Sequence, residues 1–206
     1  MHTKKHRRFR ELTVLAAAAL ALLPNCSETV RIPNCAERAV FGDPAQSPYV
    51  LPYPINTAYC ILQSYCTVRG HHNQLAYDFM MDIGTPVGVA RGGQVMGVVN
   101  LYPDSDLDPS HENHVFIRHG DGTVAFYAHL QLNSILVNVD DRVERGQPLA
   151  LSGSCGTPVP DLHFQVFQSW PPEEGYDVAV NFCNAEGQLD SRGGLMTNAC
   201  YLALPY

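Results

Sequence analysis

Polar and apolar residues alternate from Asp161 to Val166 in one stretch of this chain, Asp161-Leu162-His163-Phe164-Gln165-Val166-Phe167. Side chains two positions apart lie on the same face of a β-strand, so the apolar residues share one face and the polar residues share the other. The pattern predicts a strand that packs its apolar face on the core and presents Asp161 and His163 together on the opposite face. A carboxylate beside an imidazole suits a metal or catalytic site, and a half-buried strand with a polar outer face fits this segment alone equally well.

Short β-like runs recur around this strand and are separated by turns that contain glycine or proline. The runs are 77–80, 87–90, 95–99, 115–118, 123–130, 135–139, 148–152 and 162–167. Gly120-Asp121-Gly122 predicts a hairpin turn, and Leu101–Glu112 predicts a polar loop at the rim of a groove. No amphipathic helix of ordinary length interrupts the series. We therefore expect a mainly β domain built on an antiparallel sheet.

The N-terminal residues have the pattern of an export signal. Basic residues crowd the first ten positions, and residues 12–23 are almost entirely apolar. This apolar run is too short for a permanent membrane span, which needs roughly 20 residues, so residues 1–25 are predicted to be a secretory signal. Cleavage after Ala19-Leu20-Ala21 and lipidation of Cys26 are alternative outcomes. The proline-rich residues 26–57 are predicted to be an extended leader, followed by one domain over residues 58–206 with a disulfide-tied C-terminal extension.

Cysteine content and charge narrow the class of protein. The chain has seven cysteines, and in an exported protein we expect disulfides, with Cys60 to Cys66 and Cys183 to Cys200 as the candidate bridges. Cys155 is also expected to be bridged. The formal net charge is −7, and removal of the basic signal leaves a more acidic chain. This acidic balance excludes a nucleic-acid binder, because such a protein needs a basic surface to contact phosphates. The one membrane attachment that we expect to be possible is through a lipidated Cys26.

Two further segments carry residues suited to metal chemistry. Asp78 lies between Tyr77 and Phe79, which are expected to face the core, so Asp78 faces outward. By the same parity His72, rather than His71, shares the face of Asp78, provided that no turn intervenes. In residues 123–130 the alternation places His129 on an outer face together with Tyr127. Asp78, His163 and one of the two adjacent histidines make a His/His/Asp set with an open fourth position, which is typical of catalytic zinc.

Several of these segments occur in a recognisable order. They are Ala76-Tyr77-Asp78-Phe79 with Gly84-Thr85-Pro86-Val87 and Ala90-Arg91-Gly92-Gly93-Gln94-Val95, then His119-Gly120-Asp121-Gly122-Thr123 with Tyr127-Ala128-His129-Leu130, then the block from Asp140 to Gly153, and finally Leu162-His163-Phe164. Across about residues 51–167 the chain resembles the lysostaphin and LytM-type zinc metallopeptidases, which cut peptide cross-links in bacterial peptidoglycan. The resemblance implies their antiparallel β fold, of the duplicated hybrid motif type. The predicted signal indicates an exported protein: periplasmic, on the outer membrane as a lipoprotein, or extracellular.

The resemblance also implies roles for individual residues. His72, Asp78 and His163 are expected to bind Zn²⁺, with His71 as the alternative first ligand, and His129 is expected to assist catalysis. The chain departs from the family pattern at Asp161, where the family's final His-x-His motif has a histidine. Two hypotheses result: an active endopeptidase that uses Asp161 as a base toward the zinc-bound water, or a degenerate domain that binds wall peptides or regulates another wall hydrolase.

Overall fold

The computed structural model describes residues 34–68 and 70–206. The predicted signal and Cys26 lie outside the described residues, and the predicted domain boundaries remain predictions. The elements are α1 (Cys35–Arg38), the short helix η1 (Pro44–Gln46), β1 (Ala58–Gln63), β2 (Ala76–Met80), β3 (Pro86–Gly88), β4 (Gly93–Val99), β5 (His114–Arg118), β6 (Val124–Ala128), β7 (Arg142–Val143), β8 (Pro148–Leu151), β9 (Asp161–Phe167), β10 (Ala185–Glu186) and β11 (Cys200–Ala203).

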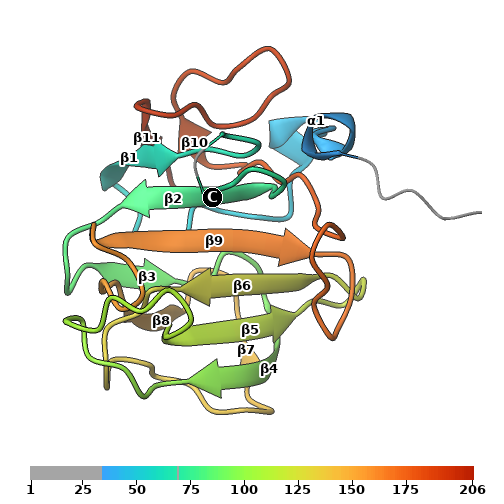
Figure 1. Ribbon diagram of the computed structural model, residues 1–206. Helices are drawn as coiled ribbons and strands as arrows, with labels where there is room; N and C mark the ends of the chain where they lie inside the picture. The colour runs from blue at the N-terminus through green and yellow to red at the C-terminus, as the bar shows by residue number, and fades with distance from the viewer. Residues whose placement is uncertain (1–33, 69) are drawn as a thin grey trace, which may run out of the picture. The chain divides into compact units, whose positions relative to one another are not determined.

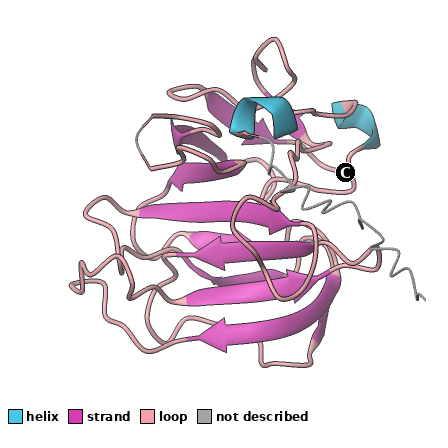
Figure 2. Ribbon diagram, turned by 45° about the vertical axis from the view of Figure 1, so that its right-hand side comes forward, coloured by secondary structure: helices cyan, strands magenta, loops and turns pink. Residues whose placement is uncertain are grey.

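One large antiparallel sheet carries the fold, as the sequence predicts. Its strand order is β10-β11-β1-β2-β9-β6-β5-β4-β7, and β3 pairs with β8 in a separate two-stranded sheet. The alternating strand β9 lies between β2 and β6 near the middle of the large sheet (Figure 1). The two short helices lie beside one end of the strand order, as the cyan segments of Figure 2 show. Among the described residues, none of the helices has the length and apolar content needed to cross a membrane.

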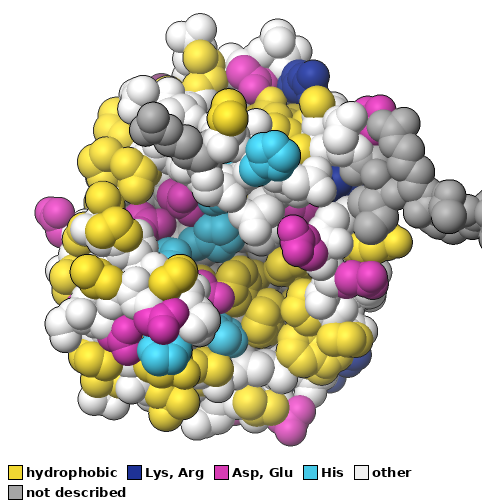
Figure 3. Space-filling model, in the orientation of Figure 1, with side chains coloured by type: hydrophobic (Ala, Val, Ile, Leu, Met, Phe, Trp, Pro, Cys, Tyr) yellow, Lys and Arg dark blue, Asp and Glu magenta, His cyan; other side chains and the backbone are white. Residues whose placement is uncertain are grey.

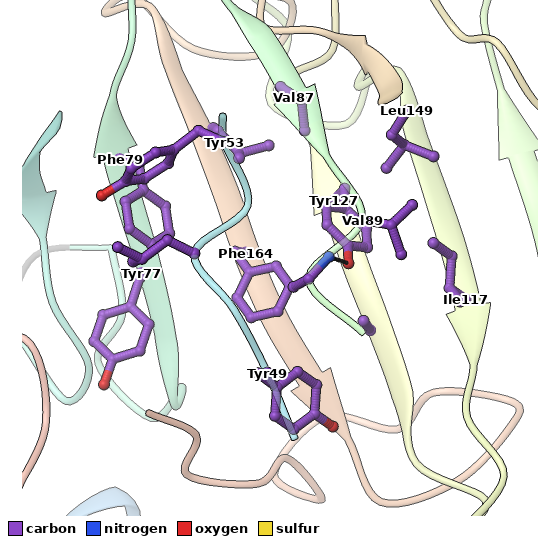
Figure 4. Close-up of a cluster of buried hydrophobic side chains, with 14 of the residues drawn as sticks. Tyr49, Tyr53, Tyr77, Phe79, Val87, Val89, Ile117, Tyr127, Leu149 and Phe164 are labelled. Atoms are coloured by element: carbon purple, nitrogen blue, oxygen red, sulfur yellow. Dashed lines mark hydrogen bonds between the residues drawn. The ribbon is translucent and has the colours of Figure 1, made fainter. Parts of the chain in front are cut away.

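The core lies against the apolar face of β9. Leu162, Phe164 and Val166 are fully buried, which confirms the face predicted from their alternation. Figure 4 shows Phe164 among Tyr77, Tyr127 and Val89, with the Tyr127 hydroxyl accepting a hydrogen bond of 2.9 Å from the Ala90 backbone nitrogen. Sheet alternation therefore directs one set of side chains into this core and leaves the other set free to build a site.

The segment before β1 packs on the domain and adds to the core. Tyr49, Leu51 and Tyr53 are buried, and the first and last of these appear in the cluster of Figure 4. The helix α1 is a single turn stabilised by a capping box, because Asn34 accepts from the Glu37 backbone and Glu37 accepts from the Asn34 backbone. The residues immediately before the sheet are thus part of the folded structure.

The disulfides differ from the predicted pairs. The structure has Cys35–Cys66 and Cys60–Cys200, and Cys155 and Cys183 are free within residues 34–68 and 70–206. Cys60 pairs with Cys200 because β1 lies directly against β11, where the two residues are cross-strand partners. This pairing depends on a contact between segments 140 residues apart, which spacing along the chain does not predict. The Gly120–Gly122 hairpin between β5 and β6 is confirmed, whereas the predicted strand at 135–139 is irregular chain.

Candidate metal and catalytic site

Two paired strands bring a carboxylate and an imidazole together. In the register of β2 against β9, Asp78 lies directly opposite His163, so the two side chains project from the same face. The Asp78 Oδ1 atom accepts a hydrogen bond of 2.8 Å from His163 Nδ1. The neighbouring pair of Met80 with Asp161 places the Asp161 side chain on this face as well. Period-two alternation thus assembles most of the site, as predicted.

The third member of the cluster is His71, from the loop between β1 and β2. Its Nε2 atom lies 3.1 Å from Asp78 Oδ1 and 3.3 Å from His163 Nδ1, and the ligand atoms of His71, Asp78 and His163 all lie within 4.8 Å of one another. His71 is buried, whereas His72 is exposed in a turn outside this cluster. The geometry favours the alternative first ligand over His72, because the turn at residues 72 and 73 interrupts the strand on which the parity argument depends.

The cluster lines a groove of about 680 Å³. The Asp161, Glu112 and His129 side chains line the same groove, and its wall continues over Phe116 and Phe126. In Figure 3 histidine and acidic side chains gather in a hollow beside hydrophobic surface. Burial raises the pKa of Glu112, which lies on the polar loop predicted at the groove rim. The groove thus combines an apolar wall with convergent polar groups, as binding and active sites commonly do.

Hydrogen bonds orient the cluster for a metal ion. The His71 Nδ1 atom donates to the Ser64 carbonyl at 3.0 Å, so Nε2 is the ring nitrogen that faces Asp78 and His163. Burial would raise the pKa of Asp78, but the hydrogen bonds from His163 and His71 outweigh it and lower the pKa well below its usual range. An ionised carboxylate with two imidazoles is the donor set of a divalent transition metal. The residues present therefore fit a zinc ion.

Asp161 adds an unusual group beside the cluster. It is only 2 % exposed, and its Oδ1 atom has no hydrogen-bond partner among the described residues. Burial, together with the negative charge of Asp78, raises the pKa of Asp161 to about 8 in the metal-free protein. A buried carboxyl oxygen without a partner is costly unless it has a function or binds a group supplied by a ligand.

His129 reaches the groove in a way that alternation does not predict. In the register of β6 against β9, Ala128 faces the site with His163, and Tyr127 faces the core with Phe164, so the predicted faces of this strand are reversed. The strand ends at Ala128, and His129 has the left-handed φ of 59°, which redirects its side chain into the groove. A non-glycine residue with positive φ at such a place is typical of a functional position.

The other histidines have structural contacts. His119 Nδ1 donates to the Gly92 carbonyl at 3.0 Å, and His111 Nδ1 lies 2.9 Å from Asp106. Sequence reasoning missed the groups behind the site, above all the buried Asp177 and Arg38, which form an ion pair. Neither residue lies in a motif or a periodic pattern, so no local signal identifies them.

The chain was compared with protein families and with known proteins. The model of peptidase family M23 matches residues 72–178, more than half of the chain. The peptidoglycan DD-endopeptidase ShyA of Vibrio cholerae is 33% identical over 123 residues, which are 55% of this chain and 26% of ShyA. The peptidoglycan DD-endopeptidase ShyC of the same organism is 32% identical over 89 residues, 43% of this chain and 18% of ShyC.

These relatives are longer than the region that they share with this chain, which spans about a quarter of ShyA and less of ShyC. Among solved structures, the antimicrobial peptidase lysostaphin from Staphylococcus simulans aligns with a TM-score of 0.50 and 22% identity over 72% of this chain and 65% of that chain. At this level of identity the likeness concerns the fold, and it agrees with the predicted antiparallel β architecture.

Proposed function

Because the chain belongs to peptidase family M23, we propose that it is an exported zinc metalloendopeptidase that hydrolyses peptide cross-links of bacterial peptidoglycan. The observation that carries the proposal is the His71, Asp78 and His163 cluster, whose ligand atoms converge in a groove beside His129 and Asp161. The relatives ShyA and ShyC, both named as peptidoglycan DD-endopeptidases, support the substrate class. The two disulfides support export, because disulfides persist in oxidising compartments.

In the proposed site His71, Asp78 and His163 hold the zinc ion. Bound zinc lowers the pKa of a coordinated water to about 7 and polarises the carbonyl of the scissile amide. Three protein ligands, as this cluster would supply, are the number typical of catalytic zinc sites.

His129 and Asp161 are proposed to handle the protons of the reaction. The Nδ1 atom of His129 donates to the Cys155 carbonyl at 2.7 Å, so Nε2 of the neutral ring is an acceptor. Burial lowers the pKa of His129, and the positive charge of His163 lowers it further, which favours this neutral form. Once Nε2 has taken up a proton, it can donate to the developing oxyanion. The unpartnered Oδ1 of Asp161 is available to hold the attacking water, and the carboxyl can take up a proton once it is ionised.

Digestion of purified peptidoglycan by the zinc-loaded protein tests this proposal. We expect new muropeptides that arise from cleaved peptide cross-links, and we expect their loss with a chelator or in His163→Ala. The absence of any zinc-dependent product from several types of cell wall would refute the enzyme proposal.

Asp161 supports a second candidate function, a domain that keeps the groove but binds wall peptides without cutting them. Two variants separate the candidates. In an active enzyme that uses Asp161, Asp161→Ala is expected to lower the rate by about 10²-fold or more, the scale of a lost general base. In a degenerate domain, Asp161→His is expected to create cleavage where the native protein has none.

A further inference from the structure

The two ring nitrogens of His163 face different partners. Nδ1 faces Asp78 and His71 in the cluster, and Nε2 faces the Oε1 atom of Gln165 at 3.5 Å. A histidine ligand binds metal through one nitrogen, and the hydrogen bond of the other nitrogen fixes which one is available. An acceptor opposite Nε2 keeps the proton there and leaves Nδ1 for the metal.

The orientation of the Gln165 amide is therefore decisive, and Asp177 fixes it. Gln165 Nε2 donates to Asp177 Oδ2 at 2.8 Å, and both side chains are buried. Asp177 is paired with the guanidinium of Arg38, and an ionised carboxylate accepts hydrogen bonds but does not donate them. Gln165 must turn its NH₂ group toward Asp177, so its oxygen is the atom that faces His163.

The same carboxylate holds the loop that carries His71. Asp177 Oδ2 also accepts from the Leu75 backbone nitrogen at 2.7 Å, at the end of this loop. Arg38 donates to the Asn73 carbonyl at 2.6 Å, two residues after His71. The Cys35–Cys66 disulfide joins the start of the same loop to α1, the helix that supplies Arg38. The ion pair of Arg38 and Asp177 thus contacts both Gln165, which faces His163, and the loop that carries His71.

We propose that Asp177, paired with Arg38, is the positioning residue of the metal site: through Gln165 it directs Nδ1 of His163 to the metal, and through Leu75 it fixes the loop of His71. This inference rests on one part of the proposed function, the binding of zinc by the cluster, and does not require that the protein cleaves peptidoglycan. Supporting residues of this kind typically change metal affinity by about 10–100-fold when they are replaced.

The test uses three variants and two measurements on the full chain. In Asp177→Asn the new amide can donate to Gln165, which allows Gln165 to turn its own NH₂ toward His163. Gln165→Met removes the oxygen that accepts from His163 Nε2 but keeps the Arg38–Asp177 ion pair and the hydrogen bond from Leu75 to Asp177. This variant therefore still tests the inference if Asp177→Asn fails to fold. Asp121→Asn is the matched control, since Asp121 also pairs with an arginine, Arg91, and lies outside the groove lining.

Zinc affinity is measured by competition with a chelator, and the His163 Nε2–H proton is followed by NMR in the zinc-loaded protein. We expect zinc binding to weaken by about 10–100-fold in Asp177→Asn and about 10-fold in Gln165→Met, with faster exchange of the Nε2–H proton in both. Asp121→Asn is expected to match the wild type. Unchanged affinity and an unchanged Nε2–H signal in the first two variants would overturn the inference. Wild-type protein that binds zinc but leaves peptidoglycan intact would refute the proposed function and not this inference.

Discussion

His71 and His72 are adjacent but lie in opposite environments. His71 is 3 % exposed, and both of its ring nitrogens have partners, whereas His72 is exposed in a turn. Removal of a metal ligand costs far more affinity than removal of a supporting group. We therefore expect His71→Ala to weaken zinc binding by more than about 100-fold, beyond the range of a supporting residue, and His72→Ala to leave it unchanged.

Metal stoichiometry and chelator competition on the two purified variants check this expectation. Because the variants differ by one position in the same loop, each serves as the control for the other. Full zinc binding by His71→Ala, or its loss in His72→Ala, would restore His72 as the first ligand.

His119 is a buried histidine whose ionisation opposes folding. Burial lowers its pKa to about 4, against about 6.5 in an unfolded chain, while nearby Arg91 lowers it further and Asp121 raises it. Between these values the unfolded chain binds a proton that the folded protein does not, so the free energy of unfolding rises with pH over this window. Acidification from about pH 7 to about pH 4 should therefore cost up to about 3 kcal/mol through His119.

Denaturant unfolding across this range, on the wild type and on His119→Gln, measures the contribution. Glutamine does not titrate but retains a donor for the Gly92 carbonyl, so the variant should lose less stability on acidification than the wild type. The exposed His72→Gln is the control. Parallel pH profiles for all three proteins would contradict the assignment.

At the scale of the strand, alternation predicts faces correctly only where the strand continues. It correctly predicts that β2 and β9 bring Asp78 and His163 together, because both residues lie within paired strands. It is wrong for residues 123–130, because every residue of β6 is buried and polarity no longer distinguishes its two faces. The chain then leaves the strand at His129. The family resemblance implies a catalytic role for His129, and the positive φ of His129 directs its side chain into the groove.

The pairing of β1 with β11 gives a prediction at the scale of elements. The Cys60–Cys200 disulfide closes a loop with a sequence separation of 140, and long loops lose the most chain entropy when they are cross-linked. Replacing both cysteines by alanine should lower the free energy of unfolding by roughly 2–5 kcal/mol. Guanidinium titration under non-reducing conditions measures the change.

Cys183→Ala is the matched control, because Cys183 is free and partly exposed. Its effect should stay within about 0.5 kcal/mol, as for most surface substitutions. A double variant as stable as Cys183→Ala would show that the bridge contributes little beyond the strand contacts.

At the scale of the molecule, the site depends on residues that local patterns do not reveal. The central strands β2, β4, β5, β6, β8 and β9 and four groove residues, Asp78, His129, Asp161 and His163, were predictable from period-two alternation and a family motif. Arg38 and Asp177 were not, since they meet only after α1 packs beside the sheet and since a single buried ion pair leaves no period in the sequence. The disulfide partners were unpredictable for the same reason. Local sequence thus specifies the elements, whereas tertiary contacts specify what supports the site.

The residues beyond the family match at 178 supply part of this core. Phe182, Leu195 and Tyr201 are buried, and the Tyr201 hydroxyl donates to the Gln188 carbonyl and accepts from the Met196 backbone nitrogen. Deletion of residues 181–206 removes these side chains together with β10 and β11, and uncovers β1 as a sheet edge. Burial of each large side chain contributes about 1.5–3 kcal/mol, so three of them approach the 5–15 kcal/mol stability of a typical domain.

We therefore expect the protein truncated after residue 180 to show no cooperative thermal transition by calorimetry. Deletion of Pro205 and Tyr206 alone is the matched control, because both residues are exposed at the end of the chain. This short deletion should melt within a few degrees of the wild type, consistent with about 1 kcal/mol or less. A cooperative transition near that of the wild type after the long deletion would show that the region matched to the family folds without its C-terminal extension.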